Sequence, residues 1–306
     1  MSGNPKIFSF VIISFNRPQE TIEVVQNILE IENVDGFSKE ILVINNGSEK
    51  SYGSFEAYLD NLNHEDRQKV IYIDHPENTG VAGGRNIGIK KATGNYLFFI
   101  DDDAEFEENF VLPFTLEKFK EYEKDNVKLI GFVVKNYYDG SLDLPVKDKS
   151  KAREKEFLNN LFWGGAHVIK KEVFDDVGLY TDEFFYGMEE YDLAYKTLDA
   201  GYRILFTSSI NVLHKVSPEG REPERTKFRR MLENKVLVAY KYLPKRYVLS
   251  HLFMWSFFYL YKSKGHITGF IKIFTSLKER SKNTERNVIS KETIKYIRSV
   301  KGRLWY

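Results

Sequence analysis

The chain has 306 residues, 42% hydrophobic and 15% aromatic, so it can bury one large core or two modest ones. It contains no cysteine, which excludes disulfides, cysteine-ligated zinc and a thiol nucleophile. The net charge is +1, but the charge is distributed unevenly along the chain. Residues 225–306 contain 20 Lys and Arg and only 4 Asp and Glu, whereas residues 1–224 contain 25 Lys and Arg and 40 Asp and Glu. A basic tail suits an anionic surface or partner. No secretory signal is visible, and we expect a cytoplasmic protein.

The first 110 residues alternate between strand and helix patterns. Helical spacing predicts helices between successive strands, at Gln19–Glu30, Tyr52–Leu62 and about Ala82–Ala92. The strands themselves are predicted from apolar runs at Phe8–Ile13, Glu40–Ile44, Val70–Ile73 and Tyr96–Ile100. This alternation is typical of βαβ units in a twisted sheet whose loops gather at one edge.

The rest of the chain divides into a mixed part and a helical part. From Val111 to Leu213 we predict strands at Leu129–Lys135, Trp163–Ile169 and Arg203–Phe206, helices at Val173–Val177 and Glu189–Ala200, and a charged flexible loop at Lys147–Glu156. From Glu224 the pattern is wholly helical. We therefore expect a catalytic domain over residues 1–220, with halves 1–110 and 111–220, and a basic, aromatic C-terminal helical region over 221–306.

Three consecutive carboxylates, Asp101 to Asp103, follow the fourth predicted strand. That strand is a continuous apolar run, as in parallel sheets buried on both faces, and ligands of open α/β sheets bind at the carboxyl ends of such strands. Adjacent like charges repel, and Mg²⁺ or Mn²⁺ would offset them through oxygen ligands. Taken alone, such a run is more often a solvated acidic loop.

A glycine-rich loop, residues 78–86, precedes the acidic run. Gly80, Gly83 and Gly84 let backbone amides approach a diphosphate at a helix N-terminus, and Arg85 can neutralise phosphate charge. A lone glycine cluster is more often a plain turn. Placed about 15 residues before an acidic metal loop, it indicates a nucleotide-diphosphate site in which a metal bridges phosphate oxygens.

These motifs, in this order, resemble the family 2 inverting glycosyltransferases of the GT-A fold, especially the bacterial rhamnosyl- and galactofuranosyl-transferase-like branch. The resemblance covers about residues 8–215. It rests on the Asn78–Asn86 loop, Asp101–Asp103, Trp163–Ala166, Phe184–Leu193 and His214. It implies an α/β fold, a Rossmann-like mixed sheet flanked by helices.

The resemblance also assigns roles to individual residues. It implies that Asp101, Asp103 and His214 bind the metal, and that Glu190 is the general base with Glu189 and Asp192 as catalytic neighbours. Trp163, Gly164 and Gly165 would contact the acceptor. The donor nucleotide would be bound by Ser14, Asn16, Arg17, Asn45, Asn78, Gly80, Gly84, Arg85, Asn86, Asp101 and Asp102. In the alternative reading, the two glutamates only stabilise a helix N-terminus and His214 is structural.

Two residues depart from the family pattern. Asn45 stands where the family usually has an Asp that binds the pyrimidine ring, which leaves the base preference open. Glu190 stands where the family usually has Asp, and its extra methylene moves the carboxylate by about one bond length.

The motifs and this resemblance together imply a metal-dependent transferase, and the resemblance implies an inverting hexosyltransferase. It would move a sugar from a UDP- or dTDP-sugar to a hydroxyl of a glycan or lipid-linked saccharide in cell-surface polysaccharide synthesis. One alternative is an inactive glycan-binding or scaffold module, which predicts loss of the carboxylates. The other, a sugar-nucleotide pyrophosphorylase, would place a basic glycine-rich loop where Ser14–Pro18 stands.

The C-terminal region contains an uncharged aromatic run, Tyr247–Tyr261, between basic residues. It is shorter than the roughly 20 residues of a spanning helix. It could be an interfacial helix at the inner face of the plasma membrane, with Trp255, Tyr259 and Tyr261 at the headgroup boundary, or simply a core helix. A homodimer face is a further alternative, and no nucleic-acid motif is present.

Overall fold

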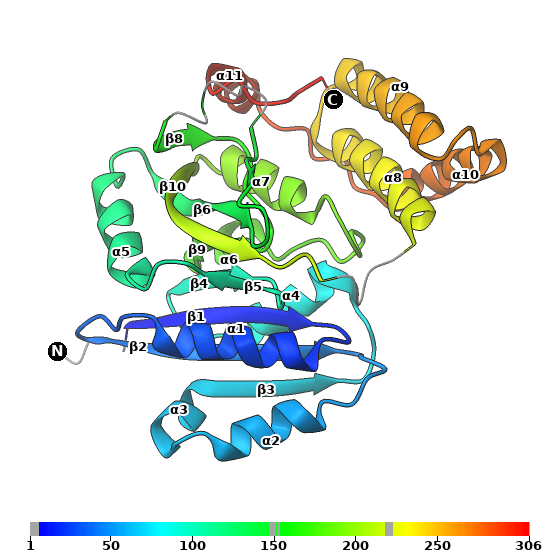
Figure 1. Ribbon diagram of the computed structural model, residues 1–306. Helices are drawn as coiled ribbons and strands as arrows, with labels where there is room; N and C mark the ends of the chain where they lie inside the picture. The colour runs from blue at the N-terminus through cyan, green and yellow to red at the C-terminus, as the bar shows by residue number, and fades with distance from the viewer. Residues whose placement is uncertain (1–5, 147–150, 152–153, 218–222, 306) are drawn as a thin grey trace.

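The computed structural model describes residues 6–146, 151, 154–217 and 223–305. Its described strands form one ten-stranded mixed sheet in the order β3-β2-β1-β4-β9-β6-β10-β5, with β7 beside β6 and β8 beside β10 (Figure 1). The strands are β1 (Lys6–Ser14), β2 (Phe37–Asn46), β3 (Val70–His75), β4 (Tyr96–Ile100), β5 (Ala104–Phe106), β6 (Val127–Asn136), β7 (Leu142–Asp143), β8 (Glu156–Asn159), β9 (Ala166–Lys170) and β10 (Arg203–His214). The α/β class predicted from the sequence is confirmed.

The first four strands in space are parallel. β1 pairs with β2 on one side and with β4 on the other, and β2 pairs with β3. The order of the strands therefore reverses beside β1, which makes this the switch point where loops diverge and α/β sheets bind ligands. The loops after β1 and β4 leave the sheet at this point.

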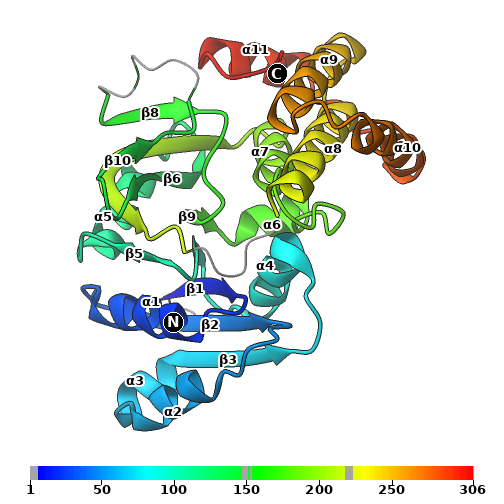
Figure 2. The ribbon, with the colours of Figure 1, turned by 45° about the vertical axis from the view of Figure 1, so that its right-hand side comes forward.

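Helices cover both faces of the sheet (Figures 1 and 2). One face packs against α1 (Pro18–Glu30), α2 (Gly53–Asn61) and α5 (Val111–Glu121), with the short α3 (His64–Lys69) after α2. The other packs against α4 (Gly80–Lys91), α6 (Glu172–Val177) and α7 (Glu189–Asp199). Phe10 and Ile12 point to the first face and Val11 to the second, because successive strand residues alternate.

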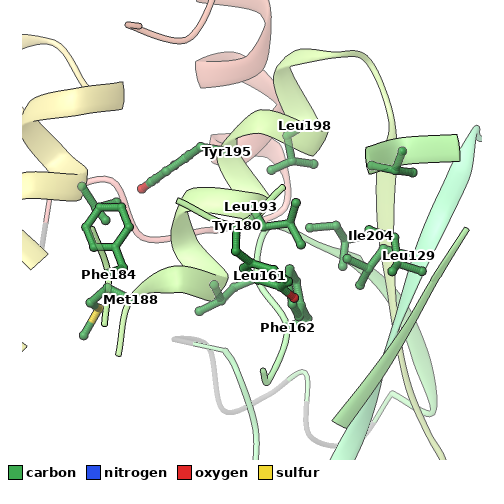
Figure 3. Packing of buried hydrophobic residues seen from close by; sticks show 14 of the residues in the cluster. Leu129, Leu161, Phe162, Tyr180, Phe184, Met188, Leu193, Tyr195, Leu198 and Ile204 are labelled. Atoms are coloured by element: carbon green, nitrogen blue, oxygen red, sulfur yellow. The ribbon is translucent and has the colours of Figure 1, made fainter. Parts of the chain in front are cut away.

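The C-terminal region forms α8 (Glu224–Tyr242), α9 (Lys245–Lys262), α10 (Ile267–Asn283) and α11 (Lys291–Ser299). α8 contacts α7, and α9 and α10 lie on its outer side (Figure 2). Figure 3 shows Leu193 of α7 pointing toward the sheet residues Leu129 and Ile204. The same core cluster includes Leu237 of α8 and Ile297 of α11. One hydrophobic core thus crosses residue 220, and the division into two domains stays a prediction.

Several elements differ from those predicted. Residues Trp163–Gly165 form a turn and β9 begins only at Ala166. β10 continues past Phe206 to His214, because a register shift between Thr207 and Asn211 absorbs its polar middle. α3, β5 and α5 were not predicted. Most of the predicted loop Lys147–Glu156 lies outside the described residues, and Glu156 begins β8.

The aromatic run predicted at Tyr247–Tyr261 lies within α9. The prediction that Tyr259 sits at a headgroup boundary is wrong, because it is 2% exposed and stacks against Phe270 of α10. Trp255 is half-buried against two core clusters, and Tyr261 is exposed. In the part of the chain that the structure describes, no helix combines the length and apolar character needed to span a membrane.

Candidate active site

The three carboxylates that follow β4 do not all point in the same direction. Asp101 and Asp103 point toward His214 at the end of β10, and one ligand atom from each of the three lies within 4.8 Å of the others. β10 delivers His214 to this place by pairing with β5, where His214 lies opposite Ala104. Two carboxylates and an imidazole are a donor set that suits Mn²⁺ or a similar divalent cation. The three residues therefore fit the predicted metal site.

Asp103 is buried and held by several donors. The ring nitrogen Nε2 of His214 lies 3.2 Å from its Oδ1, and the backbone amide of Ser217 donates to its Oδ2 at 2.8 Å. Burial pushes the pKa of Asp103 up, but the hydrogen bond to His214 and the charge of Arg17 outweigh burial and lower it. Asp103 is thus ionised, as a metal ligand must be.

Asp102 points the other way and ties two loops together. Its carboxylate accepts a hydrogen bond from Nη1 of Arg17 at 2.7 Å and one from the amide of Phe15 at 3.2 Å. Burial raises the pKa of Asp102 to about 7, although Arg17 opposes the rise. This pair fixes the loop after β1 onto the loop after β4, at the switch point of the sheet.

The loop after β1 is also joined to the loop after β2. Asn16 has a φ of 61°, and its side-chain oxygen accepts hydrogen bonds from the amides of Glu49 at 2.8 Å and Lys50 at 3.1 Å. The buried hydroxyl of Ser14 lies 2.5 Å from that of Tyr52. Both predicted donor-binding residues therefore lie at the expected edge, with these polar atoms engaged within the protein.

Asn45 has a partner that we did not predict. Its Nδ2 donates to Oδ1 of Asp74 at 2.7 Å, because β2 and β3 pair with Asn45 directly opposite Asp74. Asp74 is exposed at the end of β3. A carboxylate therefore stands next to the position where the family usually has Asp. Both residues directly follow predicted strands, Glu40–Ile44 and Val70–Ile73, and this shared position was the sequence signal that could have identified Asp74.

The glycine-rich loop is covered by the segment before α7. Gly80 has a φ of 72°, and its amide donates to Oδ1 of Asn78 at 2.9 Å. The amide of Val81 donates to the carbonyl of Phe185 at 2.7 Å, and a Cβ at Gly80 would collide with that carbonyl. A Cβ at Gly84 would lie 2.9 Å from Ile13 of β1, so this glycine permits close helix–strand packing. The phosphate contact of this loop stays a prediction.

Arg85 and Asn86, which the sequence assigned to this loop, lie within α4 and hold the region around α7. Asn86 is 5% exposed; it donates to the carbonyl of Tyr180 at 2.9 Å and accepts from its amide at 3.0 Å. Arg85 is 4% exposed, and its Nη1 lies 2.9 Å from Oε1 of Glu189, the first residue of α7. The other oxygen of Glu189, Oε2, is buried and has no hydrogen-bond partner among the described residues.

The two glycines before β9 make room for charged groups. A Cβ at Gly164 would lie 2.8 Å from the guanidinium of Arg85, and a Cβ at Gly165 would overlap the carboxylate of Asp101. Arg85 lies 3.9 Å from Asp101. Because Gly164 and Gly165 have no side chains, the guanidinium of Arg85 and the carboxylate of Asp101 can both lie close to this turn. The metal cluster and the Arg85–Glu189 pair are therefore neighbours.

A cleft of about 450 Å³ joins these groups. It is lined by two of the metal-cluster residues, Asp101 and His214, and by the predicted site residues Arg85, Trp163, Gly164, Gly165, Glu189 and Glu190. It is also lined by Lys227 and Met231 of α8, Trp255 of α9 and Arg303. We did not predict that any of these four residues would lie at the site. No motif in the sequence signals that the tail returns to the cleft.

Glu190 and Asp192 have different surroundings although they lie in one helical turn. Burial, with the nearby charge of Glu189, raises the pKa of half-buried Glu190 to about 8. Asp192 does not line the cleft: it is 0% exposed and lies 2.9 Å from Lys196 and 3.0 Å from Lys241 of α8. The two residues are about 200° apart around α7, which explains the separation. Asp192 anchors α8, whereas Glu190 faces the cleft.

Residues 9–178 match the family described as Glycosyl transferase family 2. The chain belongs to this family. This glycosyltransferase is 31% identical to an uncharacterised protein of Haemophilus influenzae over 176 residues, 55% of the chain and 90% of that protein. Several other relatives align over only 12% to 21% of their own length.

Two solved structures confirm the predicted GT-A fold. The crystal structure of GalNAc-T7 with UDP, GalNAc and Mn²⁺ matches 97% of this chain with a TM-score of 0.64 and 19% identity. The mannosyltransferase PcManGT of Pyrobaculum calidifontis, in complex with GDP-Man and Mn²⁺, matches 98% of it with a TM-score of 0.60 and 16% identity. The chain spans 57% of the first protein and 85% of the second.

Proposed function

We propose that this glycosyltransferase is a metal-dependent inverting hexosyltransferase. It moves a sugar from a nucleotide-diphosphate donor, UDP- or dTDP-linked, to a hydroxyl of a glycan or lipid-linked saccharide in cell-surface polysaccharide synthesis. One observation carries the proposal: a divalent-metal donor set and a carboxylate of raised pKa open onto the same cleft. The more specific rhamnosyl- and galactofuranosyl-transferase-like assignment stays a prediction.

On the donor side, Asp101, Asp103 and His214 would hold the cation. When bound, it would offset the negative charge of the departing diphosphate. The structures of GalNAc-T7 with UDP, GalNAc and Mn²⁺ and of PcManGT with GDP-Man and Mn²⁺ support this role. Asp74 and Asn45 would together recognise the nucleobase, since the pair offers both a carboxylate and an amide at the end of adjacent strands.

On the acceptor side, Glu190 would take the proton of the attacking hydroxyl. The hydroxyl oxygen forms a bond to the anomeric carbon while the bond from that carbon to the diphosphate breaks, and the configuration inverts. Glu189 would position the acceptor, because its buried Oε2 can accept a hydrogen bond from a second hydroxyl of the acceptor. Trp163 and Trp255, which line the cleft, provide apolar faces for sugar rings.

The test compares Glu190→Gln with Glu117→Gln, a matched change on an exposed residue of α5. Both proteins are incubated with UDP-, dTDP- or GDP-sugars, Mn²⁺ and a panel of saccharide acceptors, and nucleotide release and product are measured. We expect Glu190→Gln to bind the nucleotide as the wild type does and to transfer sugar about 10²- to 10⁴-fold more slowly. Near-normal turnover of Glu190→Gln would move the base elsewhere.

A further inference from the structure

One side of α9 exposes a row of large apolar side chains. Leu249, Phe253, Phe257 and Tyr261 follow one another at intervals of four residues and are 66%, 73%, 69% and 73% exposed. The opposite side of the helix is already used for packing, since Tyr259 is buried against α10. A surface helix normally carries polar residues on its solvent side, so this row requires a specific explanation.

α10 adds a second exposed apolar row. Ile267, Ile271 and Phe274 occupy positions i, i+4 and i+7 and are 64%, 60% and 41% exposed. Ile273 and Leu277 on the other side of α10 are buried in the cluster formed with α8 and α9. We call these seven exposed residues the docking face. α9 and α10 lie at the outer edge of the molecule in both views (Figures 1 and 2).

The charge around the docking face has one sign. Residues 245–283 contain eight Lys and Arg and a single acidic residue, Glu279. Seven of the cations are exposed: Lys245, Arg246, Lys262, Lys264, Lys272, Lys278 and Lys282. A second copy of the chain meeting this face symmetrically would bring these cations together with those of its partner, which is unfavourable. An anionic lipid surface instead attracts them.

We propose that the docking face inserts into the interface of an anionic lipid bilayer, with the surrounding lysines and Arg246 against the headgroups. The apolar side chains enter the acyl boundary while the helices lie in the plane of the surface. Trp255 lies two residues from both Phe253 and Phe257, on the other side of α9, where it lines the cleft. One helix therefore separates the cleft from the docking face. Docking depends on these surface residues and not on the transfer reaction proposed above.

The experiment is vesicle co-sedimentation of the full chain. Vesicles are phosphatidylcholine alone or phosphatidylcholine with about 30% phosphatidylglycerol. We expect binding to the anionic vesicles only, and its loss at about 0.5 M NaCl. Phe253→Ser/Phe257→Ser should weaken binding at least about tenfold. The control, Tyr138→Ser, removes an aromatic that is 77% exposed and lies outside the docking face, and it should bind as the wild type does.

Two further measurements keep the result interpretable. The thermal midpoint of each variant checks folding, and Lys262→Gln/Lys264→Gln, which removes only charge, should weaken binding to anionic vesicles without changing the apolar row. Undiminished sedimentation of Phe253→Ser/Phe257→Ser would overturn the proposal. A wild-type dimer in analytical ultracentrifugation that becomes a monomer in this double variant would also overturn it, because a second copy would then cover the face.

Discussion

The replacement Asp192→Asn tests whether Asp192 stabilises the packing of α8 or takes part in catalysis. The sequence grouped Asp192 with Glu189 and Glu190, but its carboxylate is 0% exposed and is surrounded by Lys196, Lys241 and Tyr242. Tyr242 donates to it at 2.6 Å. Asparagine keeps the shape and one acceptor oxygen but leaves both lysines without their counter-charge.

The expected loss of stability follows from these contacts. Removing one partner of a buried ion pair costs about 3–5 kcal/mol. The side chains of Lys196 and Lys241 are 16% and 12% exposed, so water can partly solvate their charges. We therefore take the lower value, about 3 kcal/mol. At about 2.1 cal/mol/K per residue, the unfolding entropy of 306 residues is about 0.6 kcal/mol/K, which gives a fall in Tm of about 5 °C.

The pH dependence has a definite sign. Burial raises the pKa of Asp192, but Lys196 and Lys241 outweigh burial and the pKa is lowered. The stabilisation is therefore present above the unfolded pKa of about 3.9 and is lost as pH falls through the folded value. The stability difference between wild type and Asp192→Asn should shrink correspondingly in acid.

Thermal unfolding followed by circular dichroism measures the effect, with Asp60→Asn, a matched change on an exposed residue of α2, as the control. Adding Lys241→Met to Asp192→Asn should recover part of the loss, since it removes one uncompensated cation. An unchanged Tm for Asp192→Asn together with lost transfer would refute this reasoning and return Asp192 to the catalytic group.

Two further predictions concern the cleft. Because burial and Glu189 raise the pKa of Glu190 to about 8, kcat/KM should rise about tenfold per pH unit below that value and level off above it, with the base ionised only at high pH. A flat profile between about pH 6 and 8 would exclude Glu190 as the base. Gly165→Ala, whose Cβ overlaps the carboxylate of Asp101, should weaken Mn²⁺ affinity at least about tenfold. Gly53→Ala, whose Cβ meets only Ser51 at 3.4 Å, is its control, and equal Mn²⁺ affinities in the two variants would contradict the packing argument.

The sequence predicted the strands of residues 1–110 well, for a physical reason. Parallel strands buried on both faces appear as continuous apolar runs, so Tyr96–Ile100 and the earlier strands could be recognised, and the carboxylates after β4 were placed at the correct edge. The link between His214 and Asp103 could not come from spacing. It depends on β10 continuing through a polar stretch and pairing with β5, and only the family resemblance had indicated it.

The parts that were missed involve orientation and long-range contacts. Asp192 is only two residues after Glu190 in the sequence, but the two side chains are about 200° apart around the helix axis. Lys227, Trp255 and Arg303 reach the cleft because the tail packs on α7, and no local pattern encodes that return. The exposed row on α9 was hidden for the same reason: an apolar run does not reveal which of its sides is already covered.

Nucleotide binding with and without metal tests the central proposal most directly. The thermal midpoint of the protein is measured with UDP, dTDP, GDP or CDP, each in Mn²⁺, Mg²⁺ or EDTA, for the wild type, Asp103→Ala and Asp101→Asn. We expect one nucleotide to raise the wild-type midpoint only when metal is present, and both variants to lose this rise. Asp101→Asn guards against misfolding, because Asp101 is half-exposed whereas Asp103 is buried. A rise that persists in EDTA or in both variants would contradict the metal-dependent transferase proposed here.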